Sequence, residues 1–269
     1  MPELPEIEAL RRYLLRQGLV GRTFVEVDAE WPGVEDSTDG MGGLSPLVGR
    51  RIKAFGRQGK QLIAKLDTGV LGLHMGMTGR LGVMAPEDES FRYRRLALYL
   101  DDERRLELDD VRRWAMVRLE NDAETFTAGM GPDALDPDFT SAQFIERVSA
   151  KRSPIKSVLL DQKVLAGVGN IYADEVLLIV GVSPSRRANK ISTRRLESLH
   201  NTIVGVLENA LAFIESHPDD QGRPYVIDTQ DDRMQIPRKP GAACPQCETA
   251  LKSKKIGGRT AYYCPSCQH

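Results

Sequence analysis

The sequence lacks any long hydrophobic run and any basic, apolar leader. Its longest purely apolar stretch covers residues 176–182, far fewer than the ~20 residues that a membrane-spanning helix needs. The chain begins Met-Pro-Glu-Leu-Pro-Glu, whereas a signal peptide begins with basic residues and an apolar segment. We therefore expect a cytoplasmic protein with no membrane partner. With 41% hydrophobic and 28% charged residues, the composition excludes a fibrous or disordered chain.

Cysteine is absent from the first 243 residues. The four cysteines form two Cys-x-x-Cys pairs, Cys244 with Cys247 and Cys264 with Cys267, separated by 16 residues. This spacing is typical of a tetrahedral four-thiolate zinc site, and it leaves no ligand position open for catalysis. Two disulfides are the alternative, but a reducing cytosol disfavours them. We therefore expect one structural Zn²⁺.

Common catalytic signatures are also absent. The four histidines are scattered, no serine lies in a nucleophile elbow, and no cysteine remains for nucleophilic work. Gly59-Lys60 lacks the upstream glycine and the following Ser or Thr of a phosphate-binding loop. These absences exclude the usual serine and cysteine hydrolases and the P-loop nucleotide hydrolases.

One nucleophile remains, at the start of the chain. Removal of Met1 would leave Pro2 as a secondary amine, and an α-amino group has a pKa near 7.7–8.0, against ~10.4 for lysine. An appreciable fraction is therefore the free base at neutral pH, without the burial that a lysine nucleophile requires. Its attack on C1′ of a sugar would give a cationic iminium, and the carboxyl of Glu3 can move protons there. The alternative is that Pro2 only starts a helix.

The net charge of −1 conceals a basic C-terminal segment. Residues 238–269 contain six Lys and Arg residues and one acidic residue, so this segment carries +5 and the rest of the chain carries −6. A basic module on a mildly acidic body is typical of contact with a polyanion, although a solvated lysine-rich tail gives the same count. Gly257-Gly258 and the extended residues 260–263 favour a hairpin, in which zinc would position Arg259.

The periodicity of the chain predicts a β-rich half and a helical half, and 269 residues suffice for about two domains. A helix is expected over residues 5–17, with Pro5 at its first position. Short β-like runs follow, typical of a sandwich or barrel. They cover residues 24–27, 61–64, 70–73, 96–99 and 116–119.

Residues 121–138 contain several Gly and Pro and are interpreted as a linker. Beyond it, Thr140 and Gln143 have the spacing of a capping box, and Ser153-Pro154 is typical of an N-cap followed by a proline at the first helical position. Helices are expected around 175–180 and over 192–216. Residues 217–237 are polar and irregular, as expected of a loop.

Three motifs, in this order, resemble those of the formamidopyrimidine-DNA glycosylase family, which includes endonuclease VIII. They are Pro2-Glu-Leu-Pro-Glu6, Gly167-Val-Gly-Asn-Ile-Tyr172 and the four-cysteine hairpin with Gly258-Arg259. The resemblance implies an α+β fold with an N-terminal helix and β-sandwich, a helix–two-turns–helix domain and a zinc-binding β-hairpin. It implies a catalytic domain at 1–120, a linker at 121–138, a DNA-binding domain with a lesion loop at 139–237 and a zinc finger at 238–269.

The resemblance also implies a bifunctional DNA glycosylase/AP lyase of base excision repair, acting as a monomer on damaged double-stranded DNA. Pro2 matches the nucleophile that displaces an oxidised purine and forms a Schiff base, after which β,δ-elimination cuts the strand. Glu3 matches the acid/base residue, Glu6 a supporting carboxylate and Lys60 the lysine that holds the phosphate beside the lesion. The implied DNA-binding residues are His74, Met77, Arg112, Trp114, Lys156, Asn170 and Arg259.

Within that set, Met77 matches the side chain that fills the gap left by the extruded base, and Arg112 and Trp114 complete the wedge. From the residues alone, Met77 and Trp114 would be core residues and His74 a structural histidine. Lys156 is explained about as well by a solvated helix face.

The sequence departs from the family pattern at Val111, Trp114 and Ala115, where Pro, Phe and Gly are usual. Before Arg238, Met-Gln-Ile-Pro replaces a usual Tyr-Gly, and the loop at 217–235 also differs. These departures bear on the preferred base. Two alternatives therefore stay open: an endonuclease VIII-like enzyme for oxidised pyrimidines, and a non-catalytic homologue that binds damaged DNA. The His-Met-Gly-Met pattern at 74–77 favours the formamidopyrimidine type.

Overall fold

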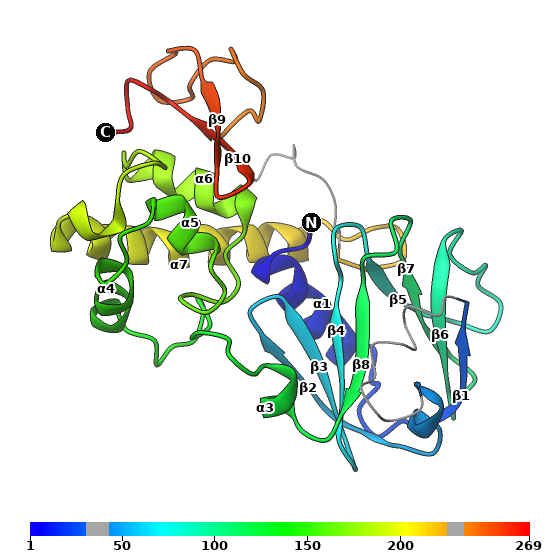
Figure 1. Cartoon of the computed structure of the whole chain (residues 1–269). Helices are drawn as coiled ribbons and strands as arrows, with labels where there is room; N and C mark the ends of the chain where they lie inside the picture. Colours follow the sequence, from blue (N-terminus) through cyan, green and yellow to red (C-terminus); the bar gives the residue numbers. More distant parts are fainter. Residues whose placement is uncertain (31–42, 225–233) are drawn as a thin grey trace. The chain divides into compact units, whose positions relative to one another are not determined.

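The computed structural model describes residues 1–30, 43–224 and 234–269 (Figure 1). They form two compact units. Unit 1 comprises Met1–Ala128 and the segment that begins at Ile214, and unit 2 comprises Gly129–Phe213 and the segment that ends at His269. Among the described residues, no helix has the length and apolar character needed to cross a membrane.

Unit 1 contains two four-stranded antiparallel sheets, with strand orders β1-β6-β7-β5 and β2-β3-β4-β8 (Figure 1). One cluster of buried side chains joins both sheets, from Leu71 and Val117 on one to Leu98 and Leu106 on the other. The expected β-sandwich is therefore confirmed. Its elements are β1 (Phe24–Ala29), η1 (Ser45–Leu47), β2 (Ile52–Gln58), β3 (Gln61–Leu66), β4 (Val70–His74), β5 (Arg80–Met84), β6 (Arg94–Leu100), β7 (Arg105–Asp109) and β8 (Met116–Glu120).

Five strands contain the expected β-like runs, whereas β2, β5 and β7 have no counterpart among them. In β7 all five residues are buried, although three of them carry charge. Glu107 accepts hydrogen bonds from Arg105 Nε (2.7 Å) and from the Phe91 N–H (2.9 Å). Because Arg105 in the same strand and the distant Phe91 N–H together satisfy the Glu107 carboxylate, a strand with charged residues can lie buried in the sheet.

The first helix, α1 (Leu4–Arg16), begins one residue earlier than expected, so Pro5 lies at its second position. Glu3 and Glu6 form a capping box at its start, which satisfies backbone N–H groups that have no partner within the helix. The apolar face of α1 joins the sandwich core, with Leu10 and Leu14 fully buried. The helix packs against β2 and β3.

The segment expected as a linker is not irregular throughout, because it contains the short helix α3 (Ala123–Phe126). The ring of Phe126 lies directly on Gly72 of β4, where an added Cβ would be only 2.4 Å from a ring carbon. Glycine at this strand position therefore makes room for an aromatic side chain that returns from beyond β8.

Unit 2 contains the helices α4 (Ser141–Ser149), α5 (Ile155–Leu160), α6 (Asn170–Ile179) and η2 (Ala188–Lys190), and it contains α7 (Thr193–Ser216) as far as Phe213. The expected capping box is confirmed, since the Gln143 N–H donates to Thr140 Oγ1 (3.3 Å) and the Thr140 N–H donates to Gln143 Oε1 (2.8 Å). The expectation for Ser153-Pro154 is wrong, because Pro154 is itself the N-cap of α5 and no side chain caps this helix. Of the expected loop at 217–237, residues 225–233 lie outside the described residues.

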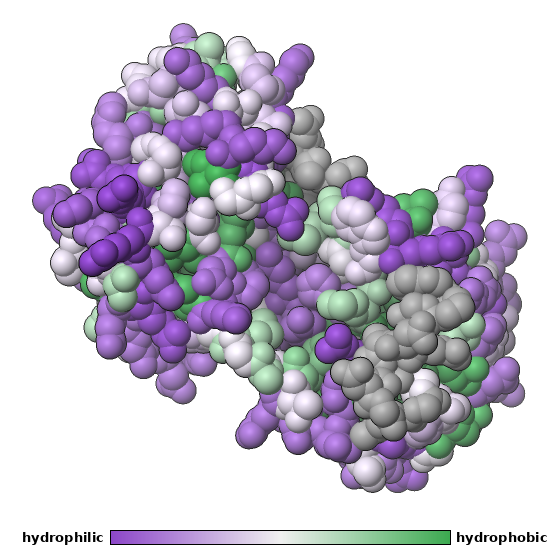
Figure 2. All heavy atoms as spheres, in the orientation of Figure 1, coloured by the Kyte–Doolittle hydropathy of each residue, from purple (hydrophilic) through white to green (hydrophobic). Residues whose placement is uncertain are grey.

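A two-stranded hairpin, β9 (Lys252–Ile256) and β10 (Arg259–Tyr263), follows in the same unit, with Arg259 paired to Ile256. Gly257 and Gly258 form its turn with φ values of +55° and +76°, which glycine adopts without strain. The hairpin packs on α6 through β10 (Figure 1). Its outer surface is mainly hydrophilic on the face drawn in Figure 2. The expected hairpin is confirmed.

Candidate functional site

The expected catalytic N-terminus lies at the start of α1. Pro2 is buried and Glu3 is only 1% exposed. The backbone N–H of Glu3 donates to Glu6 Oε2 at 2.9 Å, and Glu6 is also buried. The structure thus brings Pro2, Glu3 and Glu6 together, in a place with little access for bulk water. The Pro2 nitrogen is part of the Met1–Pro2 peptide bond in the full chain.

Lys60 lies in the tight turn between β2 and β3, which closes at the Gln58–Gln61 pair. Gly59 has φ +55° there, and Lys60 is 7% exposed. Arg57 connects this turn to α1: its Nε lies 3.1 Å from Glu8 Oε2 and its Nη1 donates to the Gly59 carbonyl at 2.9 Å. The turn that carries Lys60 is therefore fastened to the helix that begins beside Pro2.

Glu8 is the centre of this fastening and is a residue that the sequence interpretation missed. Its carboxylate accepts hydrogen bonds from Arg11, Arg12 and Arg57. Burial alone would raise the pKa of Glu8, but the hydrogen bonds and charges of the arginines outweigh burial and lower it to about 2. Glu8 is therefore ionised at neutral pH.

His74 ends β4, opposite Gln61 and hence close to the Lys60 turn. Burial lowers the pKa of His74, and the positive charge of Lys60 lowers it further, so the imidazole is neutral at pH 7. Its Nδ1 accepts a hydrogen bond from the Gly76 N–H at 3.1 Å. The ring proton is therefore on Nε2, from which His74 can donate a hydrogen bond.

A second group of expected residues, Met77, Arg112 and Trp114, meets at one surface of unit 1. The Arg112 guanidinium carbon lies 4.1 Å above the Trp114 ring, and its Nη1 lies 3.4 Å from Met77 Sδ. Trp114 is 52% exposed, so the interpretation of this residue as core is wrong. An exposed indole is chemically able to stack on a nucleic-acid base.

Buried Asp110, also missed from sequence, organises the loop that presents these side chains. One of its oxygens accepts hydrogen bonds from Thr78 Oγ1 (2.5 Å) and the Arg112 N–H (3.2 Å). The other accepts from the N–H groups of Trp114 (2.6 Å) and Ala115 (2.8 Å). Asp110 therefore joins the loop at 111–115 to the turn that carries Met77.

The expected residues Asn170 and Arg259 lie in unit 2. Asn170 is the first residue of α6, whose N-cap Gly169 offers no side-chain cap. Its side-chain Oδ1 is buried and has no hydrogen-bond partner within the part of the chain that the structure describes. Arg259 starts β10 and is exposed. The backbone N–H groups at a helix N-terminus and an exposed guanidinium can each donate to an anion.

Lys156 corrects the sequence interpretation. It is 0% exposed, so the interpretation of Lys156 as part of a solvated helix face is wrong. Nζ instead lies 2.6 Å from Asp174 Oδ1 and donates to the Thr260 carbonyl at 2.9 Å. Arg238 Nη1 lies 3.1 Å from Asp174 Oδ2, which also accepts from the Tyr262 N–H (3.2 Å).

Asp174 thus forms a buried ionic junction, which we define as Lys156, Asp174 and Arg238. The junction connects α5, α6 and β10 within unit 2. Burial raises the pKa of Asp174, and the charges of Lys156 and Arg238 oppose that effect. The sequence gives little sign of the junction, because its members are 18 and 64 residues apart.

The four cysteines meet in a single cluster, with all four Sγ atoms within 4.8 Å of one another. The separations of 4.0 Å (Cys244–Cys267), 3.5 Å (Cys247–Cys264) and 3.2 Å (Cys247–Cys267) are too long for disulfides. Four Zn–S bonds of about 2.3 Å in a tetrahedron separate the sulfurs by about 3.8 Å, so the cluster fits a zinc ion. Only a small apolar core, including Leu178 and Leu251, supports it.

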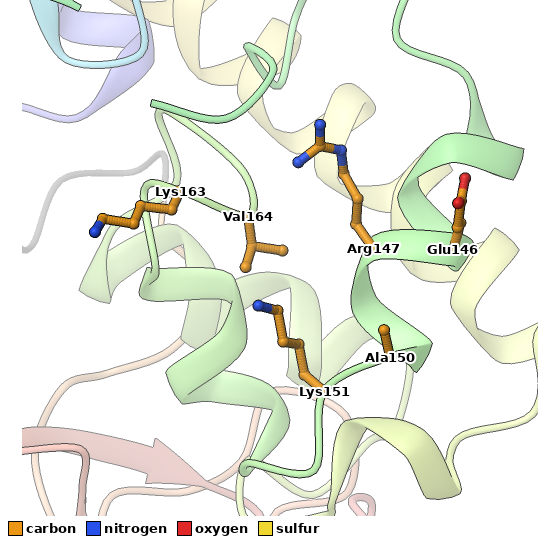
Figure 3. Close-up of a pocket in the computed structure, with 6 residues that line it drawn as sticks. All are labelled: Glu146, Arg147, Ala150, Lys151, Lys163 and Val164. Atoms are coloured by element: carbon orange, nitrogen blue, oxygen red, sulfur yellow. The ribbon is translucent and has the colours of Figure 1, made fainter. Parts of the chain in front are cut away.

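A pocket of about 370 Å³ lies elsewhere on unit 2, between the end of α4 and the loop before α6 (Figure 3). Lys151 reaches toward Val164, and Arg147 and Lys163 stand on either side of it (Figure 3). Cations at the end of α4 also complement the helix dipole. None of the residues expected in the site lines this pocket, so it is not the catalytic centre.

Three family descriptions match successive parts of the chain. Residues 1–117 match the formamidopyrimidine-DNA glycosylase N-terminal domain, residues 130–218 the formamidopyrimidine-DNA glycosylase H2TH domain, and residues 241–269 the zinc finger found in FPG and IleRS.

Full-length relatives carry the same family name. The formamidopyrimidine-DNA glycosylase of Chloroflexus aurantiacus is 35% identical, with 100% of this chain and 98% of the relative covered. That of Bacillus subtilis is 32% identical, with 100% and 99% covered.

Solved structures of MutM with DNA containing carbocyclic 8-oxo-G and of Lactococcus lactis Fpg with abasic-site DNA both have a TM-score of 0.86. They are 27% and 26% identical to this chain. Each comparison covers at least 99% of both chains.

Proposed function

The chain belongs to the formamidopyrimidine-DNA glycosylase family, enzymes of base excision repair, and on this premise we propose that it removes oxidised purines, 8-oxoguanine and formamidopyrimidines, from double-stranded DNA. In the same active site it then cleaves the strand at the abasic sugar. We expect it to act as a monomer with one structural Zn²⁺.

The observation that carries the proposal is the buried chain start, where Pro2 precedes Glu3 and the Glu3 N–H donates to the buried Glu6 carboxylate. Once Met1 is removed, the lone pair of the Pro2 nitrogen attacks C1′ of the damaged nucleotide. A bond forms between that nitrogen and C1′, and the bond from C1′ to the base breaks, so that the base leaves with the proton that the Pro2 nitrogen loses. Glu3 protonates the sugar ring oxygen as the ring opens.

The product is a cationic iminium that withdraws electrons from the sugar. It favours loss of the phosphate on one side of the sugar by β-elimination and then of the other by δ-elimination. The burial of Glu3 restricts water and strengthens the influence of this carboxyl on the developing charge.

The nucleotide must leave the base stack before this reaction, at a cost of a few kcal/mol. Lys60, neutral His74, Asn170 and Arg259 offer donors for the phosphates around it, which offset that cost. Met77, Arg112 and Trp114 occupy the gap in the stack, and the arginine reads the base left without its partner. The contacts that Arg112 makes with Met77 and Trp114 support an enzyme of the formamidopyrimidine type.

The cysteine cluster supports a structural ion. Cys244, Cys247, Cys264 and Cys267 would hold it, and the ion would supply rigidity to a hairpin whose own core is small. Its effect on catalysis would be indirect, through the position of Arg259 on the same hairpin.

Single-turnover cleavage tests the function. Duplexes carrying 8-oxoguanine or thymine glycol are incubated with the protein, with and without borohydride. We expect faster cleavage at 8-oxoguanine and a covalent adduct after reduction. Pro2→Gly should largely abolish base release while DNA binding survives. Faster reaction at thymine glycol would favour a pyrimidine enzyme, and binding without any adduct would favour a non-catalytic homologue.

A further inference from the structure

The tip of the zinc hairpin touches α5 at two consecutive residues, Lys156 and Ser157. Lys156 Nζ donates to the carbonyl of Thr260 at 2.9 Å. On the other side of the turn, a Cβ added to Gly257 would lie 2.8 Å from Ser157 Oγ. Glycine at 257 therefore avoids a clash with Ser157 Oγ, and it adopts the positive φ of +55° without strain.

Arg259 lies between these two points in the chain. It is exposed, whereas Thr260 is half-buried and Lys156 is fully buried. Because Thr260 is hydrogen-bonded to Lys156 and Gly257 lies close against Ser157, the backbone that carries Arg259 is restricted in its movement toward the helix and away from it. A long flexible side chain loses less entropy on binding when the backbone that carries it is already fixed.

The same junction reaches the other expected donor of unit 2, Asn170. Asp174 lies one turn after Asn170 on α6, and Arg238 Nη1 lies 3.1 Å from Asp174 Oδ2 and 3.5 Å from the Asn170 carbonyl. Arg238 also lies 5.0 Å above the ring of Tyr262 in β10. The buried ionic junction therefore sets the spacing between the start of α6 and the start of β10.

We propose that Lys156 is a positioning residue: with Ser157 it fixes the hairpin tip so that Arg259 and Asn170 form one rigid pair of phosphate donors. This inference rests on the proposed DNA-binding function. It assigns Lys156 an action through Arg259, without a contact of its own with DNA. A purely structural lysine would lower stability in the same way but would leave the contribution of Arg259 to binding intact.

A double-mutant cycle on DNA binding separates these roles. Affinity for a duplex with a stable abasic-site analogue is measured over a range of salt for the wild type, Lys156→Met, Arg259→Ala and the double variant. Lys156→Met keeps the length of the side chain and removes its charge. Lys254→Met is the matched control, because Lys254 lies on the same hairpin but donates to Ser185 Oγ at 2.6 Å.

We expect Arg259→Ala to weaken binding about tenfold, a typical loss for a charge-assisted hydrogen bond, and to reduce the salt slope by about 1. Lys156→Met should reproduce both effects. In the Lys156→Met background, Arg259→Ala should weaken binding little further. In the Lys254→Met background, Arg259→Ala should keep its full effect. Equal losses from Arg259→Ala in the wild type and in Lys156→Met would overturn the proposal.

Thermal melts and zinc content are measured for every variant. If Lys156→Met does not fold, Gly257→Ala takes its place, because its Cβ displaces the tip from Ser157. Combining Gly257→Ala with Ser157→Ala should restore part of the contribution of Arg259 to DNA binding. The atom nearest to the added Cβ at position 257 is then the Cβ of residue 157, 3.6 Å away. No restoration would contradict the proposal. Wild type that neither binds the duplex nor gives a borohydride adduct would reject the proposed function instead.

Discussion

Lys156 Nζ lies 2.6 Å from Asp174 Oδ1, and both side chains are 0% exposed. A buried ion pair of this kind contributes less than its Coulomb attraction, because both charges have lost their hydration. Removal of one partner still destabilises the fold strongly, because the other charge then stays buried without an opposite charge beside it. The pair therefore holds α5, α6 and the zinc hairpin in one arrangement.

Asp174→Asn should lower the free energy of unfolding by about 3 kcal/mol, the low end of the range for breaking a buried pair. The remaining amide still accepts hydrogen bonds but no longer balances Lys156 and Arg238. Denaturant unfolding measures the change. Asp138→Asn, at an exposed position of the same unit, should change stability by less than about 0.5 kcal/mol. Equal effects of the two substitutions would show that the junction does not stabilise unit 2.

Cys247→Ser should release zinc and weaken DNA binding. Loss of one of four thiolates removes much of the binding free energy that folds the small hairpin, and Arg259 loses its fixed position. Elemental analysis gives the metal content and fluorescence anisotropy gives the affinity. Ser266→Ala, exposed between Cys264 and Cys267, is the control and should keep both. Zinc-free protein with normal affinity would refute the link between the ion and Arg259.

Trp114→Ala should weaken binding to a lesion duplex about tenfold, because stacking of a base on an aromatic ring contributes about 1–3 kcal/mol. It also removes the ring on which Arg112 rests. Trp114→Phe should recover most of the loss, whereas Trp114→Leu should not. Anisotropy titrations with damaged and undamaged duplexes test this, and the same affinity for all four proteins would exclude Trp114 from the interface.

Most predictions that rest on local chemistry are confirmed, with the exception of the N-cap at Ser153-Pro154, whereas features that depend on distant residues were missed. The cysteine spacing, the glycine turn at 257–258 and the capping box at Thr140 each describe a local geometry, and each is confirmed. Strand β7 was missed because its charges are satisfied by residues such as Ser90, far from it in the chain. Exposed Trp114 and buried Lys156 reverse the usual preferences of their residue types.

The missed residues follow the same rule. Asp110 and Asp174 bind no proposed substrate, but each orders the backbone around a residue that is proposed to do so. Each lies beside a second acidic residue, Asp109 or Glu175, and the sequence gives no sign of which carboxylate has that role. Only the fold shows which N–H groups and cations converge on its carboxylate.

The lowered pKa of Glu8 predicts how the free energy of unfolding depends on pH. The pKa of Glu8 is about 2 in the folded chain, against 4.5 as the ordinary value, so the folded state favours the ionised form. Its stabilisation is present above pH 4.5 and is lost as the pH falls from 4.5 to about 2. The gap in unfolding free energy between wild type and Glu8→Gln should therefore be constant down to pH 5 and close below it. Glu26→Gln, at an exposed position, should show no such gap.

Identification of the residue that bonds to DNA tests the central claim most directly. After borohydride reduction with an 8-oxoguanine duplex, the adduct is digested with trypsin and the peptides are mapped by mass spectrometry. We predict that the reduced sugar is attached to the peptide of residues 2–11, that this peptide lacks Met1, and that the fragment ions place the added mass on Pro2. An adduct on a lysine such as Lys60, or an N-terminal peptide that retains Met1 in active protein, would contradict the account.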